Sequence, residues 1–176
     1  MSTIHDFKER LDYSLQASHE PFWDAVYEKA FPTMTSLMTV SDMDKQRLGI
    51  DRVIFLRNGK EILVDEKKRE QVWPDILLEY ISVDTTGAPG WIEKDLAIDY
   101  IAYAFMPTKT VYLFPWDFLK RAWVHYKDAW ISTYQIVPAK NEGYTTYSVA
   151  VPIPTLRKAV STASIIQLED NEGLSL

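Results

Sequence analysis

Acidic and basic residues gather where an apolar run ends, in the stretch ILVDEKKRE over Ile62–Glu70. Asp65 and Lys67 stand two residues apart there, and Asp51 begins the apolar run that comes before. Carboxylate oxygens are ligands that Mg²⁺ and Mn²⁺ prefer. A lysine next to such an ion can position water or stabilise negative charge that develops on a phosphate. These residue types suit a divalent-metal site with a lysine beside it, while the cluster taken alone is also compatible with a solvated strand end.

A hairpin is the element that would position these residues. Residues 51–67 have the sequence DRVIFLRNGKEILVDEK, in which two apolar, β-branched runs flank Asn58 and Gly59. An Asn-Gly pair between such runs is a strong signal for a tight β-turn. The turn would pair the strand that starts at Asp51 with the strand that ends in the charged cluster.

Strand alternation leaves two possible pairs of site residues. Residues two apart in a strand face the same side, so Asp65 and Lys67 project together. Glu66 and Lys68 project together to the opposite side and have the same spacing. The first pair is preferred because it continues directly from the apolar run.

A third carboxylate lies in the next apolar run, DILLEYIS, over Asp75–Ser82. A carboxylate within such a strand is costly unless it is paired or bound to a metal, which makes Glu79 informative. If this strand neighbours the hairpin, its carboxylate converges with the two aspartates. The alternative is an ion pair between Glu79 and Lys67 or Arg69.

The remaining patterns predict an α/β (α+β) domain with a mixed central sheet flanked by helices. The expected helices are 3–18, Phe22–Phe31, 115–130 and 154–160, and the further strands are 96–105, 110–114 and 144–153. The segment 96–105 is also compatible with a helix. We expect one domain over residues 1–160 and a flexible, acidic C-terminal tail over 161–176.

The bulk composition excludes several classes of protein. The chain has 176 residues, no cysteine, three histidines and a net charge of −6. Thiolate metal sites and disulfides are therefore excluded, and an all-histidine metal site is not expected. With no apolar run that could cross a membrane and no signal segment, the expected location is the cytoplasm. The acidity argues against nonspecific coating of nucleic acid, but carboxylate-bound cations can offset it locally at a nuclease site.

The order of these residues resembles the PD-(D/E)xK nuclease superfamily. This is the restriction-endonuclease-like group that includes Holliday-junction resolvases. The resemblance is carried by Asp51, a hairpin, the triplet from Asp65 to Lys67, and a preceding helix that bears Glu28. The same helix position is also compatible with a merely exposed acidic face.

The resemblance spans residues 20–130. The chain departs from the superfamily pattern at one residue, and the pattern also requires one element that the sequence does not clearly predict. Ile50 stands where the superfamily has a proline before the first aspartate. The order of elements in the restriction-endonuclease-like core also requires a helix, or a degenerate equivalent, near residues 90–99.

The resemblance implies hydrolysis of phosphodiester bonds that depends on Mg²⁺ or Mn²⁺. It implies that Asp51 and Asp65 hold the metal, with support from Glu79 or Glu28. Lys67 would orient the attacking water and stabilise the transition state.

The expected partner is nucleic acid, with DNA preferred over RNA, and a homodimer is one expected form because nucleases of this fold often dimerise. Trp91, Lys68 and Arg69 are candidate substrate-binding residues, although Trp91 is also a candidate for simple packing. The basic residues of the helix after Pro115 fit a phosphate-binding face or a solvated surface. A non-catalytic interaction or regulatory protein on the same fold is the alternative function.

Overall fold

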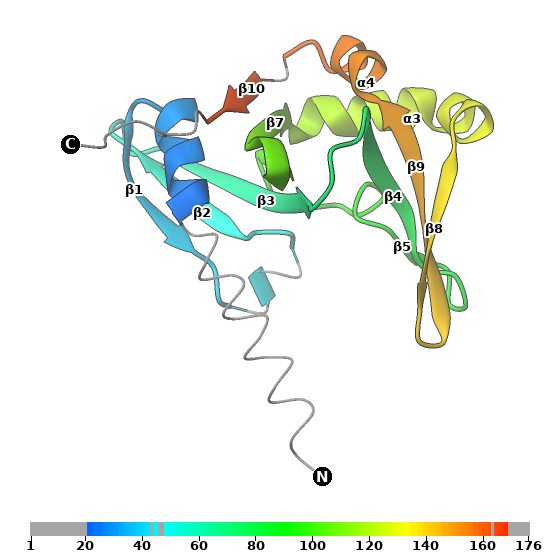
Figure 1. Ribbon diagram of the computed structural model, residues 1–176. Coiled ribbons are helices and arrows are strands. Elements are labelled where there is room, and N and C mark those ends of the chain that lie inside the picture. The colour runs from blue at the N-terminus through cyan, green and yellow to red at the C-terminus, as the bar shows by residue number, and fades with distance from the viewer. Residues whose placement is uncertain (1–20, 43, 46–47, 163, 169–176) are drawn as a thin grey trace.

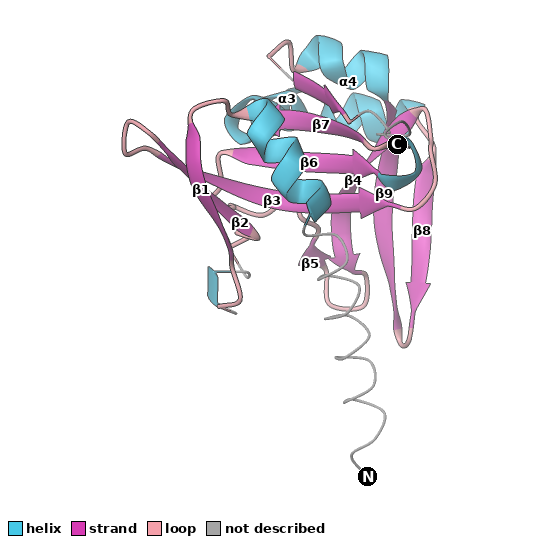
Figure 2. Cartoon of the chain, turned by 60° about the vertical axis from the view of Figure 1, so that its left-hand side comes forward, coloured by secondary structure: helices cyan, strands magenta, loops and turns pink. Residues whose placement is uncertain are grey.

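The computed structural model describes residues 21–42, 44–45, 48–162 and 164–168. Its strands form two sheets (Figure 1). The six-stranded sheet has the order β1 (Met34–Thr39), β2 (Arg52–Leu56), β3 (Glu61–Arg69), β6 (Tyr100–Phe105), β7 (Thr110–Pro115) and β10 (Ser164–Gln167). The four-stranded sheet has the order β5 (Ala88–Pro89), β4 (Asp75–Val83), β9 (Tyr144–Pro152) and β8 (Ile136–Asn141). Figure 2 shows the long strands of the second sheet running across the direction of β3, β6 and β7.

Helices and the second sheet cover the two faces of the six-stranded sheet. The helix over residues 21–30 lies on one face, where it buries Trp23 and Tyr27 among apolar side chains of β2, β3 and β6. The helices α3 (Trp116–Thr133) and α4 (Ile153–Ala159) share a second apolar core with the opposite face and the four-stranded sheet. The hairpin β2–β3 is therefore covered on one side by a helix and on the other by the second core.

The predicted helices over Phe22–Phe31 and after Pro115 are confirmed, as is the short helix that α4 forms. Pro115 is the residue that precedes α3, where its missing N–H leaves no helical hydrogen bond unmade. The predicted helix over 3–18 lies outside the described residues.

The predicted hairpin is confirmed as the antiparallel pair β2–β3, with Val53 opposite Leu63. Gly59 has a φ of 82°, a backbone conformation that glycine adopts without strain. The side chain of Asn58 accepts a 3.0 Å hydrogen bond from the backbone N–H of Lys60. The turn thus fixes the register that decides which face each residue of β3 occupies.

The α+β class and the mixed sheet are confirmed, but β4 lies in a second, four-stranded sheet that the sequence did not predict. Both edges of β3 are occupied, by β2 on one side and by the parallel strand β6 on the other. The strand β4 pairs with β9 in the second sheet, so Glu79 does not lie next to the hairpin in a ladder. The helix expected near residues 90–99 is replaced by a turn and an extended segment.

The C-terminal segment joins the first sheet instead of leaving the domain as a tail at residue 161. Residues 164–167 form β10, whose Ile166 is buried and which pairs antiparallel with β7. The rest of the expected tail, 169–176, lies outside the described residues. No helix in the described part of the chain is long and apolar enough to cross a membrane.

Candidate active site

A small cavity of about 120 Å³ opens beside the middle and second half of β3. It is lined by Gly49, Asp51, Asp65, Lys67, Trp91, Lys94 and Leu96. Three segments contribute these residues: the approach to β2, the strand β3 itself, and the segment between β5 and β6. The two aspartates and the lysine of the predicted site therefore share one cavity.

Asp65 is the most buried acid of the site, with 2% of its surface exposed. Burial and, to a smaller extent, the neighbouring Asp51 raise the pKa of Asp65 to about 7, against the opposing effect of Lys67. Two carboxylates that share a cavity favour a shared proton, or a cation that neutralises both.

Asp51 is held in place by the main chain of β3. Its Oδ2 accepts a 2.8 Å hydrogen bond from the backbone N–H of Glu66. Its own backbone N–H donates to the carbonyl oxygen of Val64 at 2.9 Å. Side chain and backbone of Asp51 are thus both bound to the strand that carries Asp65.

Lys67 lies beside Asp65, and its ammonium donates a hydrogen bond to Oδ1 of that carboxylate. The same ammonium lies 5.8 Å from the centre of the Trp91 ring. Because 30% of the Lys67 side chain is exposed, it can still reach a ligand that enters the cavity.

The alternative pair, Glu66 with Lys68, lies outside the cavity. Glu66 faces the helix of residues 21–30, where its Oε1 accepts hydrogen bonds from Arg52 Nε at 3.0 Å and from the hydroxyl of Tyr27 at 2.9 Å. Lys68 is exposed on that same side of β3. The structure therefore places Asp65 and Lys67, and not the alternative pair, in the cavity.

The other two predicted acids do not join Asp51 and Asp65. Glu28 is exposed on the helix that covers the opposite face of β3. Glu79 is half-buried in β4 and does not line the cavity, although its carbonyl oxygen accepts a hydrogen bond from the Ile92 N–H at 3.2 Å. The alternative for Glu79, an ion pair with Lys67 or Arg69, is not found either, because these two cations pair with Asp65 and Asp75.

Asp51 and Asp65 are the two carboxylate donors that the cavity offers to a metal ion. No group of three or more acidic or histidine side chains that could hold a metal occurs within the described residues. Mg²⁺ commonly binds through one or two carboxylates, retains several waters and takes further oxygens from substrate phosphates. Asp51 and Asp65 supply that minimum and fit such an ion.

The candidate substrate-binding residues have different positions. Trp91 lines the cavity but is 9% exposed, so packing accounts for most of its surface. Arg69 lies outside the cavity, where it pairs with Asp75 at 2.9 Å and lies over the rings of Trp73 and Phe105. Arg69 is thus occupied by structural contacts.

Sequence reasoning missed Gly49, Lys94 and Leu96 as lining residues. Gly49 has a φ of 81°, and a Cβ there would lie 3.1 Å from Leu96 and 3.4 Å from Oδ2 of Asp65. Gly49, two residues before Asp51, is a local signal in the sequence for a close approach of two segments. Lys94 carries no such signal, because its position depends on how a long connection folds back.

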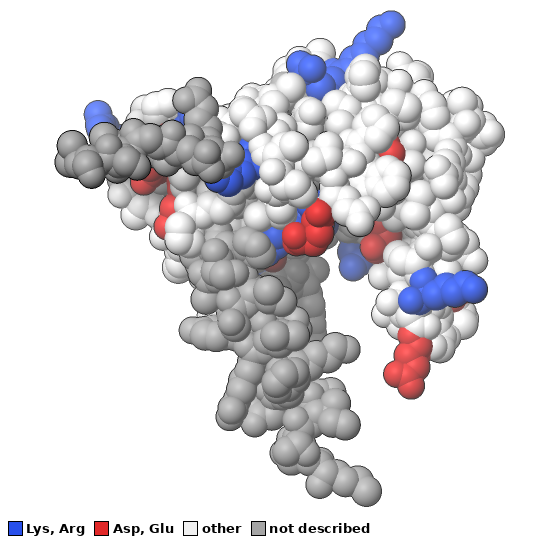
Figure 3. Space-filling view, in the orientation of Figure 1, with Lys and Arg blue, Asp and Glu red and all other residues white. Residues whose placement is uncertain are grey.

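Charged side chains of both signs gather near the centre of the view in Figure 3, over the end of β3, while much of the surrounding surface carries no charge.

Comparisons with protein-family models, with curated proteins and with solved structures found no match for this chain.

Proposed function

We propose that this chain is a metal-dependent nuclease that hydrolyses phosphodiester bonds, with DNA as the preferred substrate. The observation that carries the proposal is the shared cavity of Asp51, Asp65 and Lys67. Metal-dependent hydrolysis of this kind uses carboxylates that hold the metal ion and a cation that stabilises the phosphate. The two aspartates and the partly exposed lysine of the cavity are groups of these kinds. The resemblance to the PD-(D/E)xK superfamily assigns its motif to these same three residues.

In this proposal Asp51 and Asp65 hold Mg²⁺ or Mn²⁺. When bound, the ion supplies Lewis-acid activation of the phosphate and of a water molecule. Lys67 orients that water and stabilises negative charge on the phosphate, and its hydrogen bond to Asp65 keeps the ammonium aimed into the cavity. The apolar residue Leu96 and the Trp91 ring restrict bulk water around these groups.

A restriction-endonuclease-like core is part of the proposal. The hairpin β2–β3 supports it, because Asp51, Asp65 and Lys67 line one cavity beside this hairpin. The turn near residues 90–99, in place of a helix, is a departure from the expected order.

One observation favours a non-catalytic interaction protein on the same fold. The Lys67 ammonium already pairs with Asp65. A cavity that satisfies its own charges can persist without a metal or a reaction.

Cleavage by a pair of lysine variants separates these functions. We expect the wild-type protein to nick or degrade DNA in millimolar Mg²⁺ or Mn²⁺, and Lys67→Ala to remove this activity while the protein stays folded by circular dichroism. The matched control is Lys68→Ala, which removes the same charge from the opposite face of β3. A wild-type protein that cuts neither DNA nor RNA, or an equal loss of activity in both variants, would overturn the proposed function.

A further inference from the structure

The segment from Gly90 to Asp99 is fixed against both sheets by its main chain. Near its start, the N–H of Gly90 donates to the Tyr80 carbonyl at 3.1 Å. At its end, the N–H of Asp99 donates to the Leu63 carbonyl of β3 at 2.8 Å. The segment therefore presents its side chains to the cavity from a defined position.

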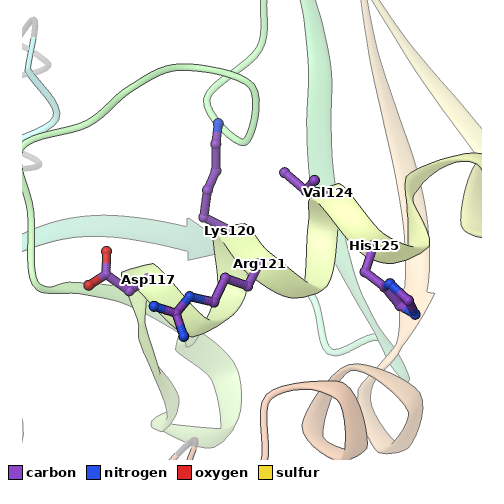
Figure 4. A pocket seen from close by; sticks show the side chains of 5 residues that line it. All are labelled: Asp117, Lys120, Arg121, Val124 and His125. Atoms are coloured by element: carbon purple, nitrogen blue, oxygen red, sulfur yellow. The ribbon is translucent and has the colours of Figure 1, made fainter.

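The basic residues of α3 hold this segment from the other side. The ammonium of Lys120 donates to the carbonyl oxygens of Ile92 and Lys94, both at 2.8 Å. Figure 4 shows Lys120 extending from α3 toward this segment. Lys127 pairs with Glu93 in the same turn. These two lysines are thus anchors of the segment.

Lys94 is the cation that the anchored segment presents at the mouth of the cavity. Lys94 is exposed, and it lines the cavity together with Asp65 and Lys67. Among the residues that the structure describes, no carboxylate forms an ion pair with its ammonium. The exposed neighbour Asp95 does not line the cavity.

The size of the cavity limits what can enter it. A volume of about 120 Å³ is close to the share of four water molecules, at ~30 Å³ each. A nucleoside is larger than such a space. In the proposed nuclease, contacts inside the cavity would therefore go to the backbone of the polymer, which carries no base sequence.

We propose that Lys94 binds the backbone phosphate next to the one that enters the cavity, so that the segment 90–96 is a sequence-independent nucleic-acid-binding element. This inference rests on the proposed nuclease function. Lys94 is a substrate-binding residue in this scheme, and Lys120 is a positioning residue that acts through the carbonyl oxygens of the segment.

Binding and its salt dependence test the inference without relying on cleavage. A fluorescein-labelled oligonucleotide is titrated with protein in EDTA, between about 50 and 200 mM salt. We expect Lys94→Ala to weaken binding about fivefold, as for a strong exposed ion pair, and to reduce the log–log salt slope by about 0.7 to 0.9. Lys94→Arg should retain binding. The matched control is Lys140→Ala, which removes an exposed lysine of β8 in the second sheet.

Each outcome addresses one proposal or the other. Equal binding and equal slopes for Lys94→Ala and Lys140→Ala would overturn the role of Lys94, even if the wild-type protein cleaves DNA. A wild-type protein that binds through Lys94 but never cleaves would overturn only the nuclease. No binding to any nucleic acid, with or without Mg²⁺, would overturn both. Lys120→Met should lower binding as Lys94→Ala does, and wild-type binding by this variant would contradict the anchoring role.

Discussion

The backbone N–H of Glu66 donates a 2.8 Å hydrogen bond to Oδ2 of Asp51, while the side chain of Glu66 lies on the opposite face of β3. The backbone of Glu66 therefore holds Asp51 beside Asp65, while the carboxylate of Glu66 pairs with Arg52 on the other face. Mutations on the two faces of this strand should separate the chemistry of the cavity from the stability of the fold.

Asp51→Asn should remove metal binding with little loss of stability. The asparagine retains an oxygen that can accept the Glu66 N–H, but it lacks the charge that a cation needs. Asp51→Ala should lose metal binding and also about 1 kcal/mol of unfolding free energy, because that N–H loses its partner. Calorimetric titration with Mn²⁺ and urea denaturation measure the two effects. Wild-type affinity for Mn²⁺ in Asp51→Asn would contradict a site built on these carboxylates.

Asp65 should make the metal-free protein less stable as pH rises. Its folded pKa of about 7 exceeds the unfolded value near ~3.9, so the folded state binds more protons between these limits. The contribution of this proton to the free energy of unfolding is fully present below about pH 4 and is lost as pH rises through about 7. Asp65→Asn removes the titration and should gain roughly 3 kcal/mol relative to wild type between about pH 5 and pH 8. Urea denaturation in EDTA measures this difference, and a gap that does not change with pH would refute the raised pKa.

Stabilisation by Mg²⁺ should grow as pH rises through about 7. A cation and a proton compete for the Asp65 carboxylate, whose pKa burial raises to about 7. Because ligand binding to the folded state raises the melting temperature, the shift caused by Mg²⁺ should be larger at about pH 8 than at about pH 6. Asp51→Asn serves as the control and should show no shift at either pH. Equal shifts of the wild-type protein at both values would mean that the ion binds elsewhere.

Glu66→Ala should destabilise the fold and leave the cavity residues in place. Arg52 is 1% exposed, and Glu66→Ala removes the carboxylate that accepts the 3.0 Å hydrogen bond from its Nε. Loss of one partner from a buried ion pair commonly costs about 3 to 5 kcal/mol. The double variant Arg52→Met with Glu66→Met should recover much of this loss, since neither charge remains. Urea denaturation of the two variants tests the prediction, which fails if the single variant loses less than about 1 kcal/mol.

Local signals in the sequence determined the part of the site that could be predicted. The Asn58-Gly59 turn sets the register of β2 against β3, and strand alternation then places Asp65 and Lys67 together. The preference for Asp65 and Lys67 rests on their position directly after the apolar run. The structure confirms the hairpin and the common side of this pair, because both features depend on neighbouring residues only.

Features that depend on distant pairing could not be predicted. The parallel partner of β3 is β6. Along the chain, β4 and β5 lie between these two strands, and both belong to the other sheet. An apolar run gives no sign of which sheet it joins, so Glu79 was expected beside the aspartates. Lys94 was missed for the same reason, because its place at the cavity depends on anchors in α3.

Gly90→Ala should disturb both stability and nucleic-acid binding. A Cβ at Gly90 would lie 2.2 Å from the carbonyl oxygen of Glu79, and no side-chain rotation can relieve an overlap with main-chain atoms. The segment must move away from β4, at a cost of about 1 to 3 kcal/mol, and it carries Lys94 out of position. The control is Gly87→Ala, where a Cβ meets open space and only the positive φ is strained. Urea denaturation and oligonucleotide binding should separate the variants: Gly90→Ala should lose both, whereas Gly87→Ala should lose some stability and retain binding. Wild-type stability and binding in Gly90→Ala would show that this segment is not held against β4 as the structure describes.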